Sequence, residues 1–235
     1  MIMLSIPDFL ARYTADGYCY STGLEELDEL IGCISGGSVI EFYGDLDVLV
    51  SLSYRLVARW SCYGNVALLV AQSSPLLYDF YEIKKRALLE NCQGSVTVSR
   101  SFRIEDTTQL LSEANTGMSR SYVLFDPFVH AVELPPKERW RLNPVVRHIR
   151  RLSGHGARVA IFNRYSVFSR SQPEGGSLYR HSVHVSVMLE KVGKRGVKAL
   201  LVKHPSRGST SVFLSIDEIE GRAEWVGQAL LSEWL

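Results

Sequence analysis

The chain has 235 residues, of which 46% are hydrophobic and 22% charged, a composition that supports a large core and excludes intrinsic disorder. No apolar run approaches the roughly 20 residues of a membrane span, and no secretory leader is evident, so we expect a cytoplasmic protein with no membrane partner. The net charge of +1 hides an asymmetry, because residues 1–50 contain nine acidic residues and one basic residue. This asymmetry indicates either a contact surface for a partner or only an uneven distribution of surface charge.

The start of the chain is expected to be an N-terminal extension over residues 1–20, followed by one core domain over residues 21–235. Thr22 and Glu25 fit a capping box, in which the side chain of each residue bonds the backbone N–H of the other. This pattern predicts a helix that begins after Thr22 and ends at Gly32.

Strand and helix patterns alternate through the next 130 or so residues. The expected strands cover residues 38–43, 66–71, 95–99, 121–125 and 158–162. The expected helices cover residues 48–62, 76–91, 105–114 and 137–152, the last with a kink at Pro144. This alternation predicts βαβ units and a mostly parallel central sheet flanked by helices.

The pattern changes after residue 180. Strands are expected over residues 183–191 and 197–203, joined by a hairpin turn, and a third strand over residues 211–216. A last helix is expected over residues 222–234. The predicted fold class is therefore α/β, with a mostly parallel sheet extended by antiparallel C-terminal strands.

Residues 44–51 lie where a phosphate-binding loop is expected, between a strand and a helix. The pattern G-x-x-x-x-G-K-[ST] keeps its first Gly and its final Ser, but Leu49 replaces the second Gly and Val50 replaces the Lys. Asp45 and Asp47 add two negative charges. Because such a loop binds phosphate with backbone N–H groups and the Lys charge, this one is predicted to be disabled.

The order of these segments resembles the RecA/RadA recombinase family, and most closely its short archaeal RadB-type paralogs. Five segments carry the resemblance, and they follow one another from about residue 21 to residue 216. They are residues 21–30 (similar to S-T-G-x-x-x-L-D-x-L), 36–44 (the strand before the P-loop), 123–126 (similar to Walker B), 181–191 and 202–207. The resemblance implies a RecA-like core domain.

The chain departs from this family at its catalytic positions. The catalytic Glu of the family falls at Gln72, which cannot take a proton from water, and its γ-phosphate-sensing Gln is Arg164. The pair linked to Mg²⁺, Ser51 and Asp126, remains. We therefore expect a degenerate nucleotide site at Gly44, Ser51, Gln72 and Asp126 in a pseudo-ATPase with no catalytic residues. No cofactor is expected, ATP with Mg²⁺ being the alternative.

Two segments match the loops that face DNA in this family. The first covers residues 127–140 and leads into a basic helix, and the second covers residues 164–180. Arginines interleaved with aromatic rings suit single-stranded DNA, and Gly175 and Gly176 would keep the second loop mobile. The candidate contacts are Lys137, Arg139, Arg141, Arg164, Tyr165, Phe168, Arg170 and Arg180. A solvated helix face, with cations near its C-terminus, is the alternative for the first segment.

The four cysteines are widely spaced and form no C-x-x-C motif. Cys19, Cys33, Cys62 and Cys92 are therefore expected to be buried free thiols in a reducing compartment, although oxidation of two of them to a disulfide stays open. No metal site is expected.

The resemblance implies an accessory factor in homologous recombination and DNA repair. Its expected partners are single-stranded DNA, a RadA-type recombinase or another paralog. Two alternatives stay open, namely a nucleotide-binding, DNA-dependent ATPase with an atypical P-loop and a RecA-fold scaffold outside DNA metabolism.

Overall fold

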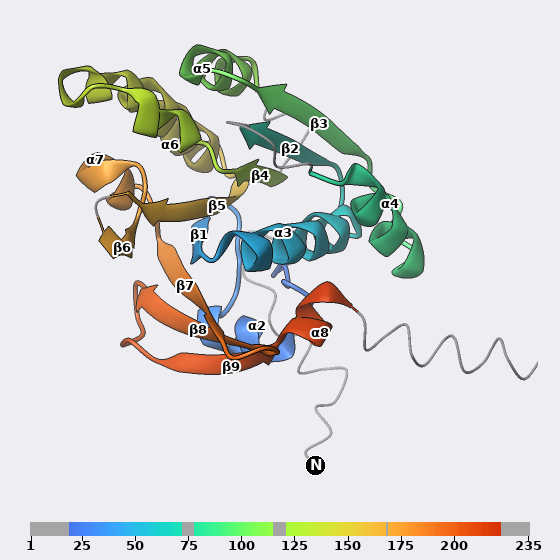
Figure 1. Ribbon diagram of the computed structural model, residues 1–235. Coiled ribbons are helices and arrows are strands. Elements are labelled where there is room, and N and C mark those ends of the chain that lie inside the picture. Colours follow the sequence, from blue (N-terminus) through green and yellow to red (C-terminus); the bar gives the residue numbers. More distant parts are fainter. Residues whose placement is uncertain (1–18, 72–77, 115–120, 168, 222–235) are drawn as a thin grey trace, which may run out of the picture.

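The computed structural model describes residues 19–71, 78–114, 121–167 and 169–221 (Figure 1). Within these ranges, no helix has both the length and the apolar character needed to cross a membrane. The helix expected over residues 222–234 lies outside the described residues, as does most of the expected N-terminal extension. Cys19 and Tyr20 are described, and Tyr20 packs in the core and bridges to Ile34.

A nine-stranded sheet lies at the centre of the molecule, in the order β3-β2-β4-β5-β1-β7-β8-β9, with β6 paired to β5. The strands from β3 to β7 in this order are parallel, whereas β8 and β9 are antiparallel additions. The bounds are β1 Val39–Gly44, β2 Val66–Ala71, β3 Val96–Ser101, β4 Ser121–Phe125, β5 Arg158–Ser166, β6 Ser169–Pro173, β7 Val185–Val192, β8 Gly196–Lys203 and β9 Ser211–Ser215. The predicted fold class is confirmed and is consistent with a RecA-like domain.

Helices cover both faces of this sheet (Figure 1). One apolar cluster joins α3 and α4 to the sheet, and a second cluster joins α5 and α6 to the opposite face. The α-helices are α2 Glu25–Ile31, α3 Leu46–Ser61, α4 Phe80–Leu89, α5 Ile104–Glu113, α6 Asn143–Gly154, α7 Gly176–Arg180 and α8 Ile216–Glu220. Two 3₁₀ helices, η1 Val129–Glu133 and η2 Pro136–Leu142, precede α6. Because both faces are covered, every residue of β1 and β4 is buried.

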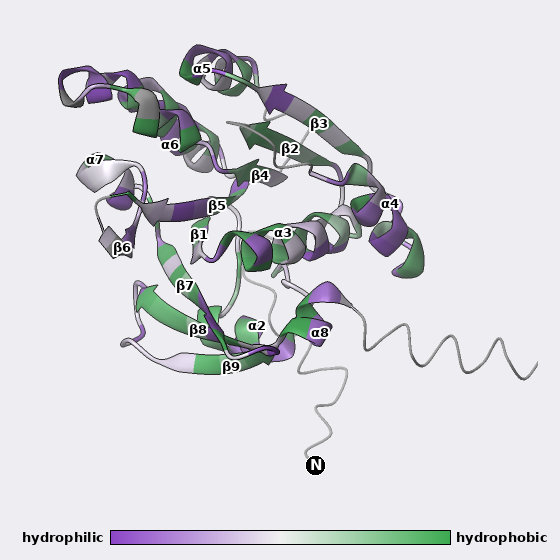
Figure 2. Cartoon of the chain, in the orientation of Figure 1, coloured by the Kyte–Doolittle hydropathy of each residue, from purple (hydrophilic) through white to green (hydrophobic). Residues whose placement is uncertain are grey.

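The predicted helix over residues 137–152 is wrong in its first half. The chain forms the 3₁₀ helix η2, and α6 begins only at Asn143, with Pro144 in its first turn. Proline suits this position because the first N–H groups of a helix have no partner within the helix. Pro144 therefore starts a helix instead of kinking one. Figure 2 shows hydrophobic and hydrophilic residues side by side on α6, as expected for a helix that packs on one face.

The predicted capping box is also wrong. α2 begins at Glu25, and Thr22 Oγ1 instead accepts a hydrogen bond from the Leu24 N–H at 3.2 Å and donates one to Asp28 Oδ1 at 2.8 Å. The predicted end of the helix is confirmed, since Gly32 has a φ of 74° and donates its N–H to the Asp28 carbonyl.

The expected loop over residues 164–180 is a structured segment wherever it is described. β5 runs on to Ser166, β6 returns antiparallel to it, and the short helix α7 follows. Gly175 is buried with a φ of 111°, and a Cβ atom there would lie 2.8 Å from the Tyr179 ring. This glycine therefore permits close packing at the start of α7.

The prediction of buried free thiols is wrong. The structure joins Cys19 to Cys33 and Cys62 to Cys92 as disulfides, and both Cys33 and Cys62 are exposed. The paired residues are separated by 14 and 30 positions in the chain, so that only the folded arrangement brings them together.

Candidate functional site at the carboxyl edge of the sheet

The junction between β1 and α3 contains no phosphate-binding loop. β1 ends at Gly44 and α3 begins at Leu46, so that a single residue joins them. Gly44 has a φ of 147°, and a Cβ atom there would lie 1.9 Å from the carbonyl oxygen of Leu189 on β7. The close approach of β7 therefore explains this glycine without any ligand.

The two acidic residues of the junction connect it to β7. The Asp45 N–H donates to the Leu189 carbonyl at 3.1 Å, and the Lys191 N–H donates to Asp45 Oδ2 at 2.7 Å. The Lys191 ammonium forms an ion pair with Asp47, which raises the pKa of Lys191. These carboxylates thus have structural partners, and the backbone N–H of Asp45 is already used.

The residues that replace the P-loop Gly and Lys belong to the packed helix α3. Leu49 is buried in the core between α3 and the sheet, and Val50 packs against the same cluster. Ser51 is half-buried and lines a shallow hollow that also contains Lys191. Ser51 and Asp126 share no hydrogen bond among the described residues, and the expected magnesium pair stays a prediction.

An ion pair between Asp126 and Arg164 occupies the carboxyl ends of β4 and β5. Arg164 lies opposite Gly44 in the register of β5 with β1, so the pair lies beside the β1–α3 junction. Arg164 Nε donates to Asp126 Oδ2, and the Asp126 N–H donates to the Phe162 carbonyl at 2.7 Å. The guanidinium thus provides the positive charge that a metal ion would bring to this carboxylate.

The surroundings of Asp126 make its ionised form costly. Burial raises the pKa of Asp126 to about 6, although Arg164 acts in the opposite direction. The residue also has a positive φ of 54°, and its Oδ1 has no hydrogen-bond partner among the described residues. A carboxylate in this environment depends on Arg164 for compensation.

A buried polar network fixes the segment after β5 onto the sheet. Glu41 on β1 is only 1% exposed, and its carboxylate accepts hydrogen bonds from Tyr179 (2.7 Å), Ser186 (2.9 Å) and Asn163 (3.2 Å). Burial raises the pKa of Glu41, while these hydrogen bonds lower it. The amide of Asn163 also donates to the Glu174 carbonyl at 2.7 Å. The network therefore joins β1, β5, α7 and β7 in one rigid unit.

No motif in the sequence predicts this network. One signal was available, namely the acidic residue Glu41 in the middle of an otherwise apolar strand, since a buried carboxylate needs hydrogen-bond donors around it. Its donors come from distant parts of the chain, and no local pattern marks them.

Several of the predicted nucleic-acid contacts are engaged with other groups of the protein. Arg141 pairs with Glu105 and Glu138, Arg164 pairs with Asp126, and Tyr165 is half-buried with its hydroxyl donating to the Leu189 carbonyl. Arg139 is partly buried. Lys137 and Arg180 are exposed and form no ion pair with another described residue. Gln72, Phe168 and the side chain of Arg170 lie outside the described residues.

A second surface has the properties of a docking site. Among the described residues β3 is an edge strand of the sheet, and α4 lies beside it where Arg100 of β3 covers the Phe80 ring. Exposed apolar side chains lie on β3, directly after it and on α4. Val98 and Phe102 are 39% and 62% exposed, while Tyr81 and Leu88 are 69% and 68% exposed. We call these four residues the β3–α4 surface. An unpaired edge flanked by apolar side chains is typical of a site where an extended segment of a partner adds a strand.

Comparison with known proteins assigns no family. No protein-family model matches the chain, and no curated protein matches it. The residues at the carboxyl edge do not fit a P-loop nucleotide site with Mg²⁺, because the loop and its Lys are replaced and Asp126 is paired with Arg164.

Proposed function

We propose that this chain is a RecA-type domain without ATPase activity that serves homologous recombination as an accessory subunit. In this proposal it binds a RadA-type recombinase or another paralog through the β3–α4 surface. The observation that carries the proposal is the Asp126–Arg164 ion pair. In a working ATPase domain this carboxylate would bind a metal ion, whereas here the Arg164 guanidinium takes the position of that cation.

The resemblance to recombinases supports the choice of partner, and the β3–α4 surface supports the mode of binding. An apolar edge strand gives main-chain hydrogen bonds for affinity and side-chain contacts for specificity.

The test is a titration of a RadA-type recombinase with the full chain and two matched variants. Phe102→Glu places a charge on the β3–α4 surface, whereas Phe213→Glu places the same charge on β9 at the opposite edge, where the exposure is similar at 66%. We expect Phe102→Glu to weaken binding by roughly tenfold or more, as charges at interface centres do, and Phe213→Glu to leave it unchanged.

The same samples are dialysed against labelled Mg-ATP. We expect no retention of nucleotide by the chain alone. Tight binding of Mg-ATP that Asp126→Asn abolishes would favour the alternative of an ATPase with an atypical loop. Equal recombinase binding by both Glu variants would contradict the docking surface, and no binding by the unmodified chain would favour a scaffold outside DNA metabolism.

Single-stranded DNA is a second candidate ligand. Lys137, Arg147 and Arg180 are exposed cations without an ion pair to another described residue, and they come from neighbouring elements, since α6 contacts both η2 and α7. Exposed cations of this kind bind phosphates without reading a sequence.

A further inference from the structure

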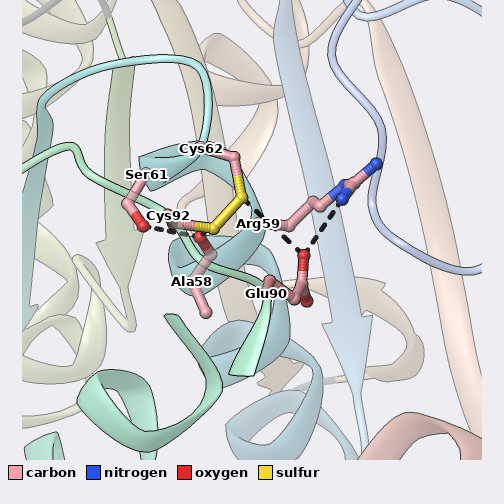
Figure 3. The surroundings of a disulfide bond; sticks show 6 residues. All are labelled: Ala58, Arg59, Ser61, Cys62, Glu90 and Cys92. Atoms are coloured by element: carbon pink, nitrogen blue, oxygen red, sulfur yellow. Dashed lines mark hydrogen bonds and ion pairs between the residues drawn. A yellow bond between two sulfur atoms is a disulfide. The ribbon is translucent and has the colours of Figure 1, made fainter. Parts of the chain in front are cut away.

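Two sulfur atoms and one carboxylate come together where α3 and α4 end (Figure 3). The ligand atoms of Cys62, Glu90 and Cys92 all lie within 4.8 Å of one another, and Cys62 Sγ lies 3.8 Å from Glu90 Oε2. No other set of three such groups occurs among the described residues. The group is open to solvent, because Cys62 is exposed and Glu90 and Cys92 are half-buried.

The backbone holds two of these residues in place from the α4 side. Asn91 has a φ of 54° and donates its N–H to the Leu88 carbonyl, and the Cys92 N–H donates to the Ala87 carbonyl at 2.8 Å. This pair of bonds is a Schellman motif, which ends a helix in one defined conformation. The positions of Glu90 and Cys92 are therefore set by the helix end and not by the disulfide alone.

The α3 side is fixed in a similar way. The Cys62 N–H donates to the Arg59 carbonyl, and the Gly94 N–H donates to the Ser61 carbonyl at 2.9 Å. A Cβ atom on Gly94 would lie 2.3 Å from that carbonyl oxygen, so that the two segments are in close contact. Reduction of the disulfide would leave these contacts in place.

The electrostatic field at this point favours a cation. The C-termini of α3 and α4 both end at the cluster, and helix C-termini carry partial negative charge from their unpaired carbonyl groups. A cation already lies there, since Arg59 forms a 3.0 Å ion pair with Glu90. Thiolates in this position would gain from a positive partner.

We propose that Cys62, Glu90 and Cys92 form a zinc site in the reduced protein, and that the disulfide is its oxidised, metal-free form. Two thiolates and one carboxylate match the ligand preference of Zn²⁺, with water in the fourth position. Among the described residues, the Cys19–Cys33 pair does not belong to such a group of three ligands, and it serves as the control.

A dithiol reductant converts the disulfide form into the reduced form. The reductant transfers two electrons and two protons to the Cys62–Cys92 bond, which becomes two thiols while the reductant forms its own disulfide. Zn²⁺ then replaces the two thiol protons, which pass to water, and Glu90 exchanges Arg59 for the metal. The inference does not depend on the proposed function.

The test uses the full chain, reduced with a dithiol, freed of the reductant without oxygen and titrated with Zn²⁺ against a chromogenic chelator. We expect one tightly bound zinc per reduced chain and none per oxidised chain. Co²⁺ in place of Zn²⁺ should give the thiolate-to-metal absorption band that reports sulfur ligands. The double variant Cys19→Ser/Cys33→Ser is the control and should still bind one zinc.

Two further variants keep both thiols of the site and so test it without loss of the disulfide. Glu90→Gln should weaken zinc binding by about tenfold or more, whereas Arg59→Met should tighten it, because the competing cation is gone. The proposal is overturned if reduced wild-type protein binds no more zinc than Cys92→Ser, if zinc is lost in the Cys19/Cys33 control, or if Glu90→Gln binds as tightly as wild type.

Discussion

At the scale of single residues, the Asp126–Arg164 pair joins two positions that the sequence shows only separately. Both positions stood out, one as a retained carboxylate and the other as an arginine in place of a glutamine. Their pairing could not be predicted, because the residues are 38 positions apart and meet only when β4 and β5 lie side by side. The departure at one position now explains how the carboxylate at the other is tolerated.

The raised pKa of Asp126 predicts how stability depends on pH. Because the folded value of about 6 lies above the unfolded value of about 3.9, protonated Asp126 favours the folded state. This contribution is complete below about pH 4 and is lost as the pH rises through 6. Relative to Asp126→Asn, the wild type should lose about 2 kcal/mol of unfolding free energy between pH 4 and pH 7.

Urea unfolding of both proteins across this range measures the difference. Arg164→Gln is the second variant, and it should move the loss to higher pH, because Arg164 lowers the pKa of Asp126. Parallel pH curves for wild type and Asp126→Asn would contradict the assignment.

At the scale of elements, the sequence predicted what depends on local pattern. β2 and β4 have the predicted bounds, and the hairpin of β7 and β8 lies where its glycine turn indicated. These strands are long apolar runs between turn residues, so the pattern is strong. β6 and α7 were missed because they are short and polar, and their positions depend on the network around Glu41. The disulfides were missed because nothing local marks them.

The junction between β1 and α3 gives a prediction about packing between elements. Gly44 and Gly64 have nearly the same φ, 147° and 148°, but a Cβ atom on Gly64 meets nothing within 4 Å. Replacement by Ala should therefore cost the same backbone strain of about 1–2 kcal/mol at both positions. Gly44→Ala must in addition displace β7, and we expect this displacement to lower the free energy of unfolding by a further amount of about 3 kcal/mol.

Chemical denaturation of the two alanine variants isolates this packing term. A difference below about 1 kcal/mol would show that β7 moves aside easily and that the junction has room for a longer loop. A difference of about 3 kcal/mol between the two variants would mean that β7 occupies the space that a phosphate-binding loop would need.

At the scale of the whole molecule, the distribution of charge distinguishes the two proposed ligands. Acidic residues are concentrated in the first fifty positions, and α2 carries Glu25, Glu26 and Asp28 in its first turn. Lys137, Arg147 and Arg180 are exposed cations on η2, α6 and α7, while other exposed cations, among them Lys84 on α4 and Arg100 on β3, lie elsewhere. The three cations Lys137, Arg147 and Arg180 thus lie on other elements than the four residues of the β3–α4 surface.

This separation predicts that DNA binding and recombinase binding are lost independently. The triple variant Lys137→Ala/Arg147→Ala/Arg180→Ala removes three phosphate contacts, and each contact on single-stranded DNA contributes about 0.7 to the slope of log K against log salt. The slope should therefore decrease in magnitude by about 2, with recombinase binding unchanged.

Arg164→Gln is the matched control, because the Arg164 guanidinium is engaged by Asp126, and it should leave the salt dependence as in wild type. Fluorescence titration of a labelled oligonucleotide at several salt concentrations measures both slopes, and an unchanged slope in the triple variant would remove single-stranded DNA from the proposed ligands.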